Sequence, residues 1–119
     1  MSKEELKEKL NNYISKYEDK LGSPNKIFIR SDLNMRFELP CNAYTNSARN
    51  ISFDLKLKHY PEDIIEHVVY HEMCHLIELN HDEGFYKLMK EVYPDYEKYE
   101  WKMSAYDYLI LREINGLKP

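Results

Sequence analysis

Residues 70–76, Tyr-His-Glu-Met-Cys-His-Leu, followed by Asn80-His81, form the stretch from which we interpret the rest of the chain. Residues four apart lie one turn apart on the same face of a helix, so His71 and His75 can direct two imidazoles at one metal ion. Catalytic zinc sites usually take three protein ligands and leave the fourth position for water. His81 is the natural third ligand, because Asn80 tolerates the left-handed conformation that ends a helix.

Glu72 directly follows the first histidine, so its carboxylate projects beside the metal position rather than at it. A carboxylate there can take a proton from a zinc-bound water and later pass it to a leaving amine. The pattern predicts a zinc-dependent peptidase with one Zn²⁺ per chain, Glu72 as the base and three ligands: His71, His75 and His81. A helix that merely carries surface histidines is the alternative, but the motif lies within an apolar run of helix length.

The sequence offers alternative residues for some roles in this site. A downstream glutamate can replace His81 as the third ligand, and the candidates are Glu78, Glu83, Glu91, Glu97 and Glu100. His67 lies one turn before His71; as a fourth ligand it would close the site, so we interpret it as a supporting or surface residue. His59 stands at the end of a predicted strand in the outward register, and we expect it to be exposed.

Two further roles have several candidates each. An acceptor for the spare N–H of a ligand histidine can come from Glu78, Asp82 or Glu83. A phenol that stabilises the oxyanion can come from Tyr44, Tyr60, Tyr86, Tyr93, Tyr96, Tyr99 or Tyr106. Eleven tyrosines are present, so the sequence does not choose among them.

Composition is typical of a soluble, globular protein. The 119 residues fit one domain, and 43% are hydrophobic while 32% are charged. A net charge of −4 without a basic block argues against a nucleic-acid surface. No apolar run is long enough to cross a membrane, and the charged N-terminus lacks a signal-peptide pattern, so we expect a cytoplasmic protein. Cys41 and Cys74 are then free thiols, with Cys74 a small buried residue rather than a ligand.

Hydrophobic periodicity predicts the elements around the motif. Residues 2–21 form a helix that starts with a capping box of Ser2 and Glu5, and residues 26–30, 34–39 and 51–58 form strands. In the third strand Ile51, Phe53, Leu55 and Leu57 face inward, and Ser52, Asp54, Lys56 and Lys58 face outward. Ala43-Tyr44-Thr45 can add to a strand. Helices follow at 61–79, at 83–93 with Asp82 as its cap, and at 95–114.

The motif and its surroundings resemble the SprT-like and YgjP-like families of zinc metallopeptidases. Those families share His-Glu-(Leu/Met)-x-His-Leu, then Asn-His, a phenylalanine and Pro-x-Tyr, which here are residues 71–76, Asn80-His81, Phe85 and residues 94–96. The resemblance extends over roughly residues 35–96 and is densest at the motif. It implies three histidine ligands, a glutamate base and activity on unfolded or flexible protein.

The chain departs from these families in two places. Residues 36–41 read Arg-Phe-Glu-Leu-Pro-Cys, where the YgjP-like pattern has an Arg-x-Trp-Gly-Ser-Cys segment. There is no Cys-x-x-Cys pair, so the zinc-ribbon tail of SprT-type DNA–protein crosslink proteases is not indicated.

We therefore predict a single α+β, zincin-like domain over residues 1–119. A small three-stranded sheet, antiparallel or mixed, packs on an N-terminal helix, a central motif helix and C-terminal helices. The partner is an unfolded protein or peptide, aligned as an added strand along residues 34–41, and neither nucleic acid nor membrane. The tyrosine-rich C-terminal helix can cover the cleft or pair with another copy, which would inhibit the enzyme. The alternative is a non-catalytic zinc protein of regulation or assembly, with a relict or blocked site.

Overall fold

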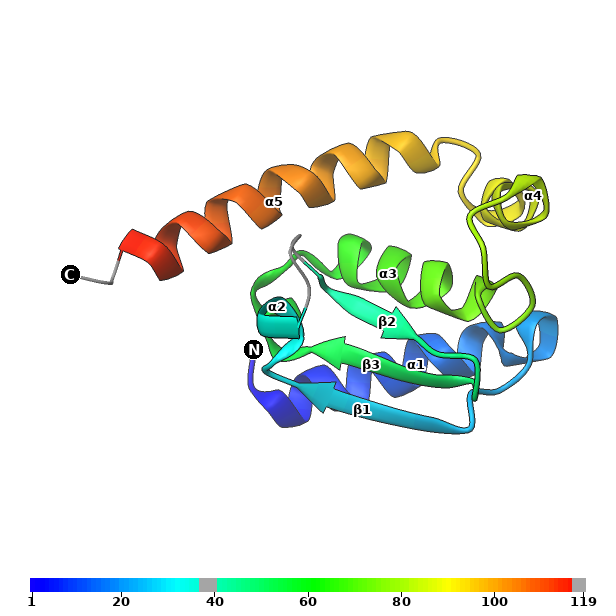
Figure 1. Ribbon diagram of the computed structural model, residues 1–119, viewed down its shortest axis with the longest axis horizontal. Helices are drawn as coiled ribbons and strands as arrows, with labels where there is room; N and C mark the ends of the chain where they lie inside the picture. Colours follow the sequence, from blue (N-terminus) through cyan, green and yellow to red (C-terminus); the bar gives the residue numbers. More distant parts are fainter. Residues whose placement is uncertain (37–40, 117–119) are drawn as a thin grey trace.

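A computed structural model describes residues 1–36 and 41–116 of the protein, and Figure 1 shows the arrangement of its elements. In chain order these are α1 (Lys3–Leu21), β1 (Lys26–Arg30), α2 (Leu33–Arg36), β2 (Ala43–Thr45), β3 (Asn50–Asp54), the 3₁₀ helix η1 (Leu55–His59), α3 (Glu62–Cys74), α4 (Glu83–Val92) and α5 (Tyr96–Gly116). The fold is α+β, as predicted. No helix within the described residues is long and apolar enough to span a membrane.

The sheet is mixed and has the strand order β1-β3-β2. β1 pairs parallel with β3, whereas β2 pairs antiparallel with β3 and forms an edge of the sheet beside α3 (Figure 1). Buried apolar side chains of α1, β3 and α3 form one cluster, which joins the helices to the sheet. α5 lies beyond α3 and extends past the rest of the molecule (Figure 1).

The predicted first helix is confirmed together with its cap. The Ser2 side chain accepts a hydrogen bond from the backbone N–H of Glu5, which satisfies one free donor of the first turn. One face of α1 is buried, and it consists of Leu6, Leu10, Ile14, Tyr17 and Leu21. The helix ends at Gly22, whose φ of 86° favours glycine.

The predicted strand at 34–39 is wrong over its described part. Residues Leu33–Arg36 form the short helix α2, residues 37–40 lie outside the described part of the chain, and the second strand is Ala43–Thr45. The Asn34 side chain accepts a hydrogen bond at 2.9 Å from the backbone N–H of Cys41. A polar side chain that bonds the backbone locally competes with strand pairing, and alternation over six residues does not reveal this.

The predicted strand at 51–58 is too long, and its outward face is partly wrong. β3 ends at Asp54, whose carboxylate accepts a hydrogen bond at 2.9 Å from the backbone N–H of Lys56 and caps η1. Ser52, Asp54 and Lys56 are buried rather than outward and exposed. β3 is the central strand, and Ser52 lies in register between Phe28 of β1 and Tyr44 of β2. These large neighbours cover its small side chain.

The predicted motif helix at 61–79 is also too long. α3 ends at Cys74, and Ile77 and Leu79 are about half exposed, at 52% and 53%. The backbone N–H of His75 bonds the carbonyl of Glu72, which tightens the last turn. The Arg49 guanidinium donates to the carbonyl of Leu76 at 2.8 Å and holds the turn that follows.

The two C-terminal helices follow the predicted order. Asp82 caps α4 by accepting a hydrogen bond from the backbone N–H of Phe85, as predicted. α5 packs more loosely, because none of its side chains that the structure describes is fully buried. Leu109 of its predicted apolar stripe is 53% exposed.

His67 of α3 packs against α5. The side chain is fully buried, and neither ring nitrogen has a hydrogen-bond partner. It stacks on Tyr99 of α5, with ring centroids 5.2 Å apart, and meets the edge of Tyr93 at 4.8 Å. Burial lowers the pKa of His67 to about 4, although Asp63 and Asp95 oppose this shift. His67 is therefore a packing residue.

Replacing His67 should change how stability depends on pH. The unfolded chain binds more protons than the folded one between the ordinary pKa of 6.5 and the folded value of about 4, so His67 costs stability as the pH falls through this window. We expect His67→Phe to gain up to about 3 kcal/mol over wild type as the pH falls from 7 to 4. Urea unfolding of both proteins in chelator measures this, with the exposed His59→Phe as control. Parallel pH profiles would contradict the expectation.

Candidate metal centre

The structure brings the three predicted ligand histidines together. Nε2 of His81 lies 3.2 Å from Nε2 of His71 and 3.1 Å from Nε2 of His75. His71 lies in the last turn of α3, His75 directly follows the helix in α conformation, and His81 comes from the loop before α4. Within the described residues these three form one candidate metal-binding group, which includes none of the five candidate glutamates.

The spacing of the nitrogens fits a four-coordinate metal. Nitrogen ligands about 2.0–2.1 Å from a zinc ion in tetrahedral geometry lie about 3.4 Å from one another. Nδ1 of His75 donates to the carbonyl of Glu78 at 2.9 Å, so its Nε2 presents a lone pair to the cluster. Burial, followed by repulsion from His75 and His81, lowers the pKa of His71 to about 3 and keeps that ring neutral. Neutral imidazoles are the form that binds metal.

Two supports orient these rings. The acceptor for His75 is the backbone carbonyl of Glu78, not one of the carboxylates considered from the sequence. Phe85 of α4 is fully buried behind the cluster; its ring stacks on His75 at 4.7 Å and meets His71 and His81 edge-on, each at 4.9 Å. A rigid apolar surface of this kind restricts the rotamers available to the ligands.

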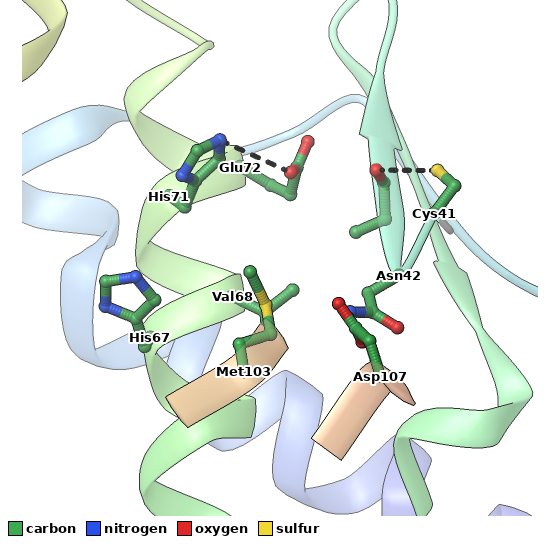
Figure 2. A pocket seen from close by; sticks show the side chains of 9 residues that line it. Cys41, Asn42, His67, Val68, His71, Glu72, Met103 and Asp107 are labelled. Atoms are coloured by element: carbon green, nitrogen blue, oxygen red, sulfur yellow. Dashed lines mark hydrogen bonds and ion pairs between the residues drawn. The ribbon is translucent and has the colours of Figure 1, made fainter. Parts of the chain in front are cut away.

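Glu72 lies beside the cluster and not in it. Figure 2 shows the Glu72 carboxylate beside the ring of His71. One carboxylate oxygen is 4.0 Å from Nε2 of His71, and the other accepts a hydrogen bond at 2.8 Å from the Thr45 hydroxyl of β2. Burial raises the pKa of Glu72 to about 7, and the Thr45 hydrogen bond opposes that shift. No pattern in the sequence indicates this role of Thr45, because the contact with α3 depends on the pairing of β2 with β3.

A cleft of about 200 Å³ opens beside Glu72, between β2, α3 and α5. It is lined by Cys41, Asn42, Ala43, His67, Val68, His71, Glu72, Met103 and Asp107 (Figure 2). Met103 and Asp107 belong to α5, so this helix covers the cleft. No tyrosine lines it among the described residues, and the hydroxyls of Tyr60 and Tyr93 bond Asp107 and Glu66 instead.

The structure also tests the expectations for the two cysteines and for His59. Cys41 and Cys74 are free thiols, as predicted, and Cys74 is fully buried. His59 is exposed, as predicted, although it lies in η1 and not in a strand.

Comparison with known proteins identifies the family. The sequence model of the YgjP-like metallopeptidase domain matches residues 1–106, most of the chain. The protein belongs to the YgjP-like metallopeptidase family. No curated protein sequence is matched significantly.

A solved structure supports the fold of this YgjP-like domain. The metallopeptidase zymogen abylysin of Pyrococcus abyssi superposes with a TM-score of 0.66, and the match covers 81% of this chain and 92% of abylysin. The two sequences are only 19% identical, so the likeness concerns the fold. The YgjP-like protein is thus a metallopeptidase with a zincin-type fold.

Removing one histidine of the cluster tests the ligand set. We expect His81→Ala to weaken zinc binding at least about a hundredfold, beyond the usual cost of losing a supporting partner. Titration against a chromophoric chelator measures the affinity, and zinc content per chain gives the stoichiometry. His59→Ala, on the exposed surface of η1, is the matched control. Wild-type affinity in His81→Ala, together with a loss in Glu100→Gln, would show that a glutamate is the third ligand.

Proposed function

We propose that this metallopeptidase hydrolyses peptide bonds in unfolded or flexible polypeptides. The ligands are His71, His75 and His81, the metal is zinc, and Glu72 is the base. One observation carries the proposal: a buried carboxylate lies 4.0 Å from a nitrogen of the three-histidine cluster and lines the cleft beside it. The family match and the zincin-type fold support the class of reaction.

Each group has a distinct role. A zinc ion held by the three imidazoles supplies a Lewis acid, which polarises a carbonyl and makes water more acidic. Glu72 accepts the proton of the attacking water and returns it to the leaving amine. Its raised pKa, about 7, suits a group that must both take and give a proton near neutral pH. Thr45 positions the carboxylate through its 2.8 Å hydrogen bond.

The shape of the cleft favours an extended substrate. The edge strand β2 contributes Ala43 to the wall opposite α3, and Asn42 precedes it. An extended peptide can lie along such an edge, with its backbone bonded to the strand. We therefore propose β2, instead of residues 34–41, as the strand that pairs with the substrate. An unfolded or flexible segment suits this position, because it can adopt the extended conformation along β2 without disrupting a fold.

Changing the base separates catalysis from metal binding. We expect Glu72→Gln to keep zinc at one ion per chain and to lose proteolysis of a disordered protein such as casein by at least about a thousandfold. Chelator treatment of the wild type should give the same loss, and added zinc should restore activity. Glu4→Gln, in the exposed first turn of α1, is the matched control. Proteolysis that survives in metal-replete Glu72→Gln would remove Glu72 from this role.

The covering position of α5 favours a second reading of the site. Because α5 closes the cleft, the protein is either a self-inhibited peptidase or a zinc-binding protein whose blocked site serves regulation or assembly. We favour self-inhibition, since none of the described side chains of α5 is fully buried. Its polar attachments include the ion pair of Lys102 with Asp63 at 2.8 Å and the hydrogen bonds of Asp107. Its ring contacts include Tyr99 with His67 and Tyr106 with Tyr60.

Loosening α5 should release activity if the protein inhibits itself. We expect Lys102→Ala/Asp107→Ala to raise the cleavage rate of casein roughly tenfold, because it removes one exposed ion pair and one partly buried set of hydrogen bonds. Lys98→Ala/Glu113→Ala is the control, since it removes one charge of each sign from exposed positions on the same helix. A rate equal to or below that of the wild type would argue against self-inhibition.

A further inference from the structure

The carboxylate of Asp107 occupies a polar recess away from the metal centre. Figure 2 shows Asp107 and Asn42 facing one another at the opposite end of the cleft from His71 and Glu72. The carboxylate accepts a hydrogen bond from the Asn42 side-chain N–H at 2.8 Å and another from the Tyr60 hydroxyl. Both donors belong to the body of the domain, whereas the acceptor belongs to α5.

The recess is buried, and hydrogen-bond donors face the carboxylate of Asp107. Asn42 and Tyr60 are 8% and 4% exposed, and Lys56 beside them is also buried and donates to the carbonyl of Cys41 at 2.6 Å. Burial lowers the pKa of Lys56, and the negative charges of Asp54 and Asp107 oppose this shift. Asp54, 3.5 Å from the Lys56 ammonium, balances part of this positive charge. The neutral donors Asn42 and Tyr60 therefore hold the acidic side chain of Asp107. Lys56, whose charge Asp54 partly balances, lies nearby.

The helix that supplies the acid is also the helix that covers the cleft. When α5 moves aside to admit a substrate, as the proposed self-inhibition requires, Asp107 leaves with it. Asn42 and Tyr60 then lose the acceptor for two buried donors, which is costly unless another acceptor replaces it. The Asn42 side-chain oxygen is also buried without a hydrogen-bond partner, so it can accept a backbone N–H of a bound peptide, since a carboxylate side chain has none to donate.

From these contacts we infer that the recess of Asn42, Tyr60 and Lys56 is a substrate subsite for an aspartate or glutamate side chain. Asp107 fills this subsite while α5 covers the cleft. The inference rests on the proposed peptidase function and deepens it, because it names a class of sequence that the enzyme prefers. A substrate acid and Asp107 then compete for the same donors.

The strand geometry places this subsite along the substrate. Thr45 bonds Glu72 at the catalytic position, and Asn42 lies three residues earlier, where its carbonyl continues the pairing with β3 at 2.8 Å from the Asp54 nitrogen. An extended chain rises about 3.3 Å per residue, so the separation is about 10 Å. The preferred acid should lie two to three residues from the bond that is cleaved.

Cleavage-site profiling tests the preference. Metal-replete wild type and Lys102→Ala/Asp107→Ala digest a peptide library, and mass spectrometry reads the residues on both sides of each cut. At one position two to three residues from the cut, we expect peptides with Asp or Glu to be cleaved about ten times as often as those with Asn or Gln, as hydrogen bonds to a charged group imply. Asn42→Ala should lose this preference, whereas Asn12→Ala, at an exposed position of α1, should keep it. Asn42→Asp should instead favour Asn or Gln over Asp or Glu at this position.

A binding measurement makes the test independent of catalysis. Zinc-loaded Glu72→Gln, carrying Asp107→Ala to empty the recess, is titrated with fluorescent peptides that differ only by Glu or Gln at each position in turn. We expect the Glu peptide to bind about tenfold more tightly at one position, and Tyr60→Phe, which keeps the ring, to reduce the difference. Thermal melts confirm that each variant is folded.

The outcomes separate the subsite from the proposed function. Cleavage without any acid preference overturns the subsite and leaves the peptidase intact. A Glu-selective binding difference without cleavage by any variant supports the subsite and overturns the proposed catalysis. Faster cleavage in Asn42→Ala with the acid ratio unchanged would show that the Asp107 contacts only fasten α5, and would overturn the subsite.

Discussion

The structure depends on the convergence of three imidazoles on one point. Nε2 of His81 lies 3.1 Å from that of His75 and 3.2 Å from that of His71, a spacing that suits nitrogen ligands of one cation. The chain holds them there by three means: the helical spacing of His71 and His75, the tightened turn after α3, and the ring of Phe85 behind the cluster. Binding of a metal ion to the three rings would therefore be coupled to the folding of α3, its following loop and α4.

Burial then gives the carboxylate beside this cluster its chemistry. Glu72 lies between α3 and β2, where few dipoles other than the Thr45 hydroxyl stabilise its charge. A carboxylate in this environment holds its proton more strongly than one in water, which suits proton transfer near neutral pH. The edge strand thus contributes both the wall of the cleft and the group that aims the base.

α5 completes the cleft and occupies it at the same time. Its inner face places Met103 and Asp107 where an extended substrate would lie, yet the helix is only partly buried and extends beyond the body of the domain. A helix with no fully buried side chain among its described residues can be displaced at a modest energetic cost. In the proposed scheme, inhibition and substrate specificity use the same donors, Asn42 and Tyr60, because one carboxylate can replace another.

The sequence by itself determined the helices, the mixed or antiparallel sheet and the convergence of His71, His75 and His81, because these follow from local periodicity, capping and the spacing of a short motif. It misplaced the second strand and the end of the motif helix, where Asn34 and Arg49 bond backbone groups that a local pattern does not reveal. Only the tertiary structure decided that Thr45 meets Glu72, that His67 is buried under Tyr99, and that Asp107 reaches Asn42. These pairs lie 27 to 65 residues apart in the chain, and contacts at such distances depend on how whole elements pack.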